Sequence, residues 1–144
     1  RVVPCGAEGA VPEALRRLSC VARESRLALV AGLIDVKDCG VDPTLPECHL
    51  SQDGYLLFNT VVVLDSDGAY LARYHKANLW GEALMDAGAD CKIVEFTPAA
   101  IGVTFGVFTC ADLIHAWPAL DMVGRGVRHF VMPLAWSNEM AQMQ

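Results

Sequence analysis

A cysteine at position 110 stands at the end of a strand-like segment, a placement that suits a nucleophile. The apolar segment GVFTC leads into Cys110, and the residues after it are predicted to be helical. A thiol at the start of a helix meets backbone N–H groups that favour the thiolate, which is the nucleophilic form of cysteine. The alternative is a buried structural cysteine, which is common in protein cores. This segment alone leaves both interpretations open.

A lysine and a glutamate that follow one another in a single loop suit the needs of an attacking thiolate. Lys76 ends the strand-like segment ARYHK, and Glu82 comes soon after it. A lysine beside a cysteine would lower the pKa of the thiol, and it would stabilise the negative oxygen that forms when a carbonyl is attacked. The carboxylate would orient the lysine by ion pairing. Taken singly, a solvated lysine and a surface glutamate are the ordinary alternatives.

Other polar and aromatic side chains are candidates for the wall of a site or for structural roles. His75 is expected to point to the opposite face of the strand from Lys76, because side chains alternate along a strand. Asp112 suits helix capping better than catalysis. Trp136, at the end of the last predicted strand, and Asn138, just after it, are candidates for lining a pocket, although core packing explains an isolated Trp equally well. No Cys-x-x-Cys or His-x-x-x-His spacing occurs, so no metal site is expected.

Strands and helices alternate along the chain, and this order predicts a layered α/β fold with a mixed sheet. Residues 12–25 have the apolar periodicity of a helix. Residues 27–34 form an almost continuous apolar run, which is typical of a strand covered on both faces. Residues 55–65 and 69–76, separated by a turn sequence, predict a β-hairpin. The remaining predicted elements are strands at 92–96, 101–109 and 129–136 and a helix at 113–125.

The composition is that of a folded, acidic chain. Its 144 residues are 53% hydrophobic and 19% charged, so a buried core is expected. A formal net charge of −6 argues against a nucleic-acid partner, because an acidic surface repels phosphates. No apolar run is long enough for a transmembrane segment, and no signal-peptide pattern opens the chain. No linker divides the sequence, which at this length fits one domain.

Two of the six cysteines flank a loop that is rich in turn residues. Cys39 and Cys48 bracket this loop in the sequence DCGVDPTLPEC. The spacing predicts a local disulfide, which would place the protein in an oxidising compartment. The alternative is a pair of free loop thiols.

Two segments resemble the lysine and cysteine motifs of the nitrilase superfamily, the carbon–nitrogen hydrolases. They are ARYHKANLWGE at residues 72–82 and FGVFTCADL at residues 105–113. Both are most similar to the biotinidase/vanin (pantetheinase) branch, and the resemblance extends through the chain to PLAWSNEM near its end. It implies a nitrilase-like four-layer α-β-β-α sandwich that is incomplete here, with residues 1–144 forming part of one carbon–nitrogen hydrolase domain.

The resemblance also implies a catalytic set of Glu, Lys and Cys. Cys110 would attack a linear carboxamide of the pantetheine or biotinyl amide type and form a thioester. Lys76 and the backbone N–H of Ala111 would form the oxyanion hole, and Glu82 would match the family's supporting glutamate. The implied partner is a small-molecule amide, and no metal or organic cofactor is implied. The branch and the proposed disulfide together favour an extracellular or cell-surface location.

The sequence departs from the family pattern at two points. The general-base glutamate has no match, since Glu8 and Glu13 lie at or near the start of the first predicted helix. Ala111 stands where this branch usually has a bulky aromatic residue, which leaves the acyl group and the amine of the substrate open. The chain alone is therefore expected to be inactive. The alternative hypothesis is a catalytically inactive fragment or pseudoenzyme of the same fold that acts by binding.

Overall fold

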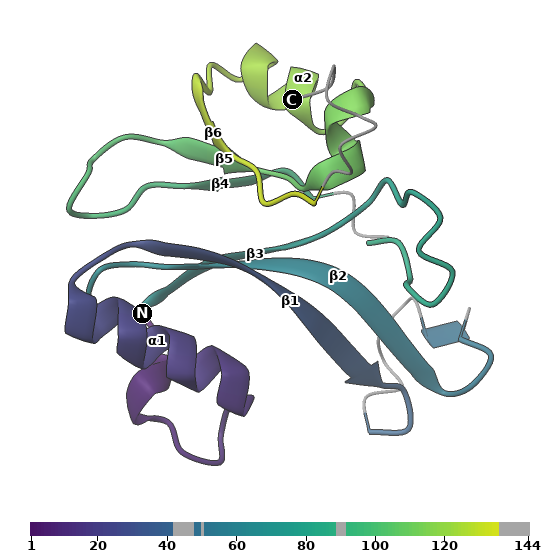
Figure 1. The fold of residues 1–144 in the computed structure, drawn as a ribbon, viewed down its shortest axis with the longest axis horizontal. Helices are drawn as coiled ribbons and strands as arrows, with labels where there is room; N and C mark the ends of the chain where they lie inside the picture. Colours follow the sequence, from purple (N-terminus) through teal and green to yellow (C-terminus); the bar gives the residue numbers. More distant parts are fainter. Residues whose placement is uncertain (42–47, 50, 89–91, 136–144) are drawn as a thin grey trace.

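Two three-stranded sheets lie face to face in the computed structural model, and each carries a helix on its outer side (Figure 1). Helix α1 (Glu13–Ser25) covers the first sheet, and helix α2 (Ala119–Gly124) covers the second. The order of layers is therefore α-β-β-α, as expected. The structure describes residues 1–144 except 42–47, 50, 89–91 and 136–144.

The first sheet is an antiparallel meander with the strand order β1-β2-β3. Strand β1 (Leu29–Asp38) pairs with β2 (Tyr55–Leu64) along its whole length. Strand β3 (Tyr70–His75) pairs with the other edge of β2. The predicted hairpin over residues 55–65 and 69–76 is confirmed, since both of its strands and the turn between them are present.

Strand β1 departs from the sequence prediction in its surroundings. The apolar run at 27–34 predicted a strand covered on both faces, and this prediction is wrong. From Gly32 to Asp38 the residues alternate between exposed and half-buried, and Ile34 and Val36 are 61% and 55% exposed. The reason is the pairing, because β1 lies at the edge of the described antiparallel sheet and not inside a parallel one.

The second sheet is mixed, as expected. Its strands are β4 (Val94–Phe96), β5 (Phe105–Val107) and β6 (His129–Val131). Strands β4 and β5 are antiparallel, whereas β5 and β6 are parallel. All three are shorter than the apolar runs that predicted them. At the end of β6 the reason is visible, because Pro133 has no N–H to continue the ladder.

The crossover from β5 to β6 holds two short helices instead of the single helix predicted at 113–125. A 3-10 helix, η3, spans Cys110–Ile114, and α2 follows Pro118. Proline offers no backbone N–H and restricts the residue before it, so one helix cannot run through this position. The first helical turn also begins earlier than predicted, directly at Cys110.

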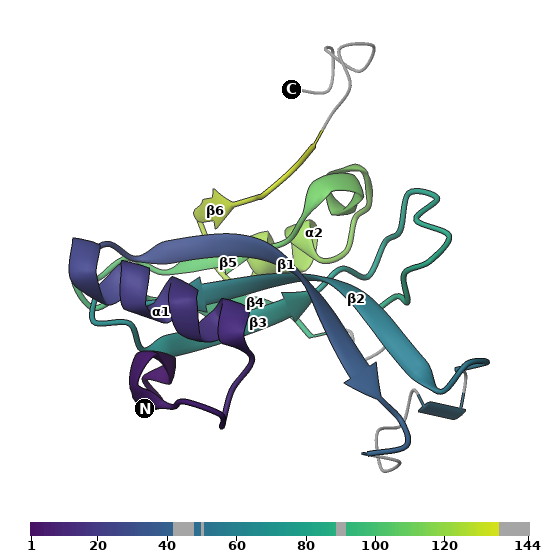
Figure 2. The ribbon, with the colours of Figure 1, turned by 60° about the horizontal axis from the view of Figure 1, so that its bottom comes forward.

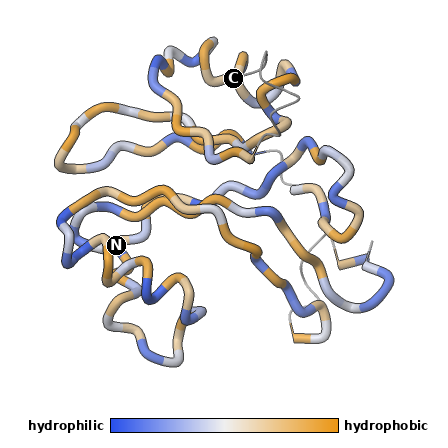
Figure 3. Tube along the Cα trace, in the orientation of Figure 1, coloured by the Kyte–Doolittle hydropathy of each residue, from blue (hydrophilic) through white to orange (hydrophobic). Residues whose placement is uncertain are grey.

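The hydrophobic core lies between the two sheets. It is formed by buried residues of both sheets, of the crossover and of the loops next to them: Val61, Val63, Tyr74, Val94, Phe96, Val107, Phe108, Met122 and Val127. Figure 3 shows hydrophobic residues along much of β1 and β2 and hydrophilic residues in the loops beyond them. Burial of this shared apolar surface holds the two sheets together.

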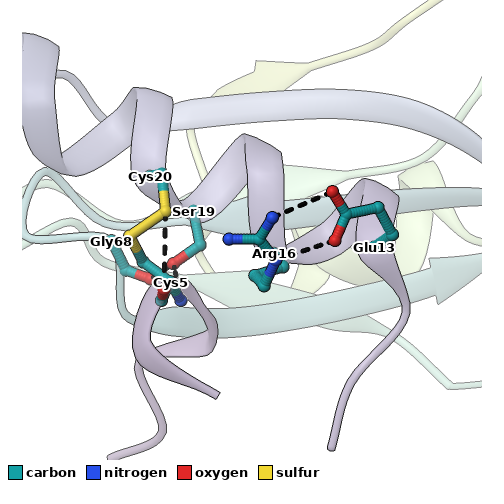
Figure 4. The surroundings of a disulfide bond; sticks show 6 residues. All are labelled: Cys5, Glu13, Arg16, Ser19, Cys20 and Gly68. Carbon is teal, nitrogen blue, oxygen red and sulfur yellow. Dashed lines mark hydrogen bonds and ion pairs between the residues drawn. A yellow bond between two sulfur atoms is a disulfide. The ribbon is translucent and has the colours of Figure 1, made fainter. Parts of the chain in front are cut away.

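A short N-terminal segment fastens α1 to the outer face of the first sheet (Figure 2). Helix η1 (Pro4–Gly6) carries Cys5, which forms a disulfide with Cys20 of α1 (Figure 4). Ser19 Oγ donates to the carbonyl oxygen of Gly68 at 2.6 Å and accepts from the N–H of Cys5 at 3.0 Å. Gly68 has φ of +82°, and a Cβ there would lie 2.6 Å from the backbone oxygen of Ser19, so the contact requires glycine.

A second disulfide joins Cys39 to Cys48, the pair that the loop sequence indicated. Within the described residues, Cys110 is the free cysteine. The described part of the chain contains no helix that is both long and apolar enough to span a bilayer.

Candidate active site

Cys110 lies at a sharp turn where β5 leads into η3. Thr109 is extended, with φ of −141°, and Cys110 has φ of +51°. The left-handed region is uncommon for a residue with a side chain, and such strained positions concentrate at functional sites. Thr109 Oγ1 donates to the carbonyl oxygen of Pro133 at 2.5 Å, which ties the turn to the segment after β6. The side chain of Cys110 is half-buried, so its thiol remains within reach of a small molecule.

The side chain of Lys76 is fully buried and ion-paired with Glu82. The backbone N–H of Lys76 donates to the carbonyl oxygen of Asn59 at 2.8 Å, which fixes the residue beside β2. Glu82 also accepts a hydrogen bond from the backbone N–H of Trp80. Burial raises the pKa of Glu82, but the ion pair with Lys76 and the bond from Trp80 outweigh burial and lower this pKa. The carboxylate is therefore ionised at neutral pH and balances the buried ammonium.

Cys110 and Glu82 line the same open cavity, whose volume is about 420 Å³. A volume of this size is in the range of small-molecule sites. Lys76 is not among the lining residues, but its ammonium is ion-paired with the Glu82 side chain, which is. The cavity is completed by two polar and several apolar or small residues, namely Asn59, Thr109, Gly32, Trp80, Pro133, Leu134 and Ala135.

The structure describes only some of the remaining predicted site residues. Ala111 is fully buried in the first turn of η3, where backbone N–H groups have no partner within the helix. Trp136 and Asn138 lie outside the described residues. Ala135, the last residue described, lines the cavity. No group of His, Cys, Asp or Glu in the described residues is arranged to hold a metal ion.

His75 points away from this cavity, as the alternation along β3 predicted. Its Nε2 lies 3.0 Å from Asp35 Oδ2 on β1. Asp35 also pairs with Arg73 at 3.0 Å and with Lys37 at 3.2 Å. Burial raises the pKa of Asp35, but the bond to His75 and the two cationic side chains outweigh burial and lower it. The side chains of the adjacent residues His75 and Lys76 thus lie on opposite faces of one sheet.

A second cavity lies on the outer face of the first sheet, beneath α1. Its volume is about 330 Å³, and its lining includes Leu15 of the helix and Leu33, Val62 and Tyr70 of the strands. Cys110, Lys76 and Glu82 take no part in it. The residues that the sequence singled out for chemistry therefore gather on the inner side of the first sheet.

The sequence matches a known family over nearly its whole length. The family model described as carbon-nitrogen hydrolase matches residues 7–143. Biotinidase of Takifugu rubripes is 42% identical over 128 residues, which are 89% of this chain and 25% of that protein. Pantetheinase of Sus scrofa is 40% identical over 126 residues, which are 85% of this chain and 23% of that protein. The chain thus spans about a quarter of the length of the curated relatives it matches.

The fold is similar to that of solved nitrilase-superfamily structures. A mutant of the amidase from Nesterenkonia sp. AN1 superposes with a TM-score of 0.67 and 22% sequence identity, covering 97% of this chain and 50% of that one. That structure shows covalent addition of the acetamide moiety of fluoroacetamide at its active-site cysteine. The predicted nitrilase-like sandwich is therefore confirmed, and it is present in part. The chain belongs to the carbon–nitrogen hydrolase family.

Proposed function

We propose that this chain supplies the nucleophile, the buried lysine and the supporting glutamate of an enzyme that hydrolyses a linear carboxamide. One observation carries the proposal: Cys110, at a positive-φ turn, shares its cavity with Glu82, which holds the buried Lys76. Family membership and the relatives named biotinidase and pantetheinase favour an amide as the substrate.

In the proposed first step, the Cys110 thiolate attacks the carbonyl carbon of the amide, and the carbonyl π electrons move to the oxygen. The Lys76 ammonium and the N–H of Ala111 stabilise this oxyanion. The C–N bond then breaks, the amine leaves with the proton that the thiol gave up, and a thioester remains. Water hydrolyses the thioester, which releases the carboxylic acid and regenerates the thiol. The general base that moves these protons is assigned to no residue of this chain.

Glu82 has a supporting role in this proposal. The side chain of Lys76 is fully buried, and a buried charge requires an ion-pair partner, which here is Glu82. Asn59 Nδ2 lies 3.5 Å from the same carboxylate oxygen, so β2 helps to hold the pair in place. The ammonium is thereby fixed before the oxyanion forms, which is the condition for efficient electrostatic stabilisation.

The substrate that we propose is a small amide with a pantothenyl or biotinyl type of acyl group. The exposed Trp80 and Leu134 give the cavity an apolar wall for such a group. Trp136 and Asn138 remain proposed pocket residues. The two disulfides support an extracellular or cell-surface location, because disulfides persist in oxidising compartments. We also propose that residues 1–144 are part of one carbon–nitrogen hydrolase domain.

The test is amide hydrolysis by the complete gene product, assayed on pantetheine and on a biotinyl anilide. Cys110→Ala is expected to lower kcat by at least about 10³-fold, because the nucleophile is gone. Lys76→Met is expected to lower kcat by about 10²–10³-fold, the usual effect of losing one oxyanion donor. Lys37→Met, on the outer face, is the matched control and should leave kcat unchanged. Undiminished hydrolysis by Cys110→Ala would overturn the proposal.

A second candidate function is binding without turnover. The absence of a residue assigned as general base and the small Ala111 after the nucleophile favour it. The same assays separate the two functions. A protein that binds the amide tightly but releases no acid, and whose Cys110 is not selectively alkylated by iodoacetamide, would be a pseudoenzyme.

A further inference from the structure

Asp112 is a buried carboxylate that receives four hydrogen bonds from different parts of the chain. Its side chain is fully buried. Its Oδ2 accepts from the N–H of Thr109 at 3.0 Å and from the Tyr74 hydroxyl at 2.8 Å. Its Oδ1 accepts from the backbone N–H of Asn78 at 3.0 Å and from the side-chain amide of Asn78 at 2.8 Å. All four donors are uncharged amide or hydroxyl groups.

Helix capping explains only part of this arrangement. Thr109 and Asp112 form a capping box at the start of η3, as the sequence indicated, and this motif uses the bond from the Thr109 N–H. The other three bonds come from residues on either side of Lys76, namely Tyr74 in β3 and Asn78 in the loop that follows. A helix cap needs none of them.

The donors on the lysine side are themselves linked. The Tyr74 hydroxyl accepts from the N–H of Ala77 at 3.4 Å while it donates to Asp112. The side-chain amide of Asn78 also donates to the carbonyl oxygen of Trp117 at 3.0 Å. The segment around Lys76 and the crossover that carries Cys110 are therefore joined by one buried network, and such networks hold their members in a single arrangement.

We propose that Asp112 is a positioning residue, which fixes the Cys110 turn against the segment that carries Lys76. Only a carboxylate accepts hydrogen bonds at both oxygens, and both are used here. The catalytic consequence rests on the proposed function, whereas the positioning of the thiol rests on the geometry alone. Asp112 does not touch the reacting atoms in this scheme, and it acts through the two segments that it joins.

The test is Asp112→Asn in the complete gene product. Asparagine keeps the shape of the side chain but turns one acceptor into a donor, which must face donors from Tyr74 and Thr109 or from Asn78. We expect kcat on an amide substrate to fall by about 10–100-fold with KM nearly unchanged, since a displaced reactive group costs rate more than binding. We also expect slower alkylation of Cys110 by iodoacetamide, because the turn that presents the thiol is no longer held in a single arrangement.

Asp65→Asn is the matched control. Asp65 is also a buried aspartate, 1% exposed, and it accepts backbone N–H bonds from Ser66 at 2.8 Å and from Ala99 at 3.1 Å. It lies at the β2–β3 turn, at the other end of that hairpin from Lys76. Asp65→Asn should lose thermal stability, as Asp112→Asn does, but its Cys110 should be alkylated at the wild-type rate.

The outcomes are separable. If Asp112→Asn folds and its Cys110 is alkylated at the wild-type rate, Asp112 is only a helix cap and the proposal is overturned. If it does not fold, Tyr74→Phe and Asn78→Ala each remove part of the network and should slow alkylation in the same direction, by about 2–10-fold; wild-type rates in both would also overturn the proposal. If the wild type cleaves no amide, the proposed function fails, while the alkylation rates still decide whether Asp112 positions Cys110.

Discussion

The two faces of the first sheet are covered by different physical means. The inner face packs against the second sheet through a shared apolar core. The outer face is covered by α1, which the Cys5–Cys20 disulfide and the contacts of Ser19 hold in place, and a cavity of about 330 Å³ remains beneath the helix. Each face thus has a cavity, the one beside Cys110 on the inner side and the one beneath α1 on the outer side. The inner face adds a packed core, which positions side chains rigidly.

The two faces also differ in how deeply their charged side chains are buried. On the inner face Lys76 is fully buried with Glu82 as its ion-pair partner. On the outer face Asp35 contacts Lys37, Arg73 and His75, and these side chains are in part exposed. A half-exposed cluster contributes little to stability, whereas a buried pair is strongly destabilised when one partner is removed. The inner pair is therefore the one whose loss should have a large effect.

The largest effect on stability is expected in the inner core. Phe108 is 4% exposed and packs on Phe130 at a ring-centroid distance of 5.8 Å. Phe108→Ala should lower the free energy of unfolding by about 3–5 kcal/mol, because it leaves a cavity in packed surroundings. Leu15→Ala, beneath α1, should cost only about 1 kcal/mol, because Leu15 is half-buried and already borders a cavity. Urea unfolding measures both changes, and equal losses would contradict the comparison.

The second-largest effect on stability is expected from the disulfide that holds α1 on the outer face. The Cys5–Cys20 disulfide closes a loop with a sequence separation of 15 residues. Replacing both cysteines by alanine should lower the free energy of unfolding by about 3 kcal/mol, from the greater entropy of the unfolded chain. Thermal melts of wild type and variant at neutral pH measure this loss. The rate of Cys110 alkylation in the folded variant should be unchanged, and a large fall would mean that the outer face supports the site.

The smallest effect is expected from the Asp35 cluster. The folded state lowers the pKa of Asp35, so the stabilisation from this carboxylate is complete above its ordinary pKa of 3.8 and disappears as the pH falls through the folded value. Asp35→Asn should therefore cost about 1 kcal/mol or less at pH 7. At a pH well below 3.8 the variant and the wild type should be equally stable. Urea unfolding across this pH range measures the difference, and a cost that persists in acid would show that packing of Asp35, not its charge, matters.

Local rules in the sequence determined several features of this protein. Alternation along residues 69–76 predicted that Lys76 and His75 lie on opposite faces, and the nearness of Glu82 in the same loop made the ion pair one of two interpretations. The turn sequence between two apolar runs specified the β2–β3 hairpin. These features depend on neighbours in the chain, so short-range geometry was enough to predict them.

Contacts between distant segments were decided only in the tertiary structure. Nothing in the sequence pairs Cys5 with Cys20 or directs Tyr74 and Asn78 to the carboxylate of Asp112. The positive φ of Cys110 could not be predicted from the sequence either, because cysteine does not favour the left-handed region. The sequence by itself singled out Cys110, Lys76 and Glu82 as candidates for chemistry and indicated the strands that lead to them. Packing of the two sheets and the crossover decided how these residues meet, because burial and hydrogen bonding between remote segments have no local signature.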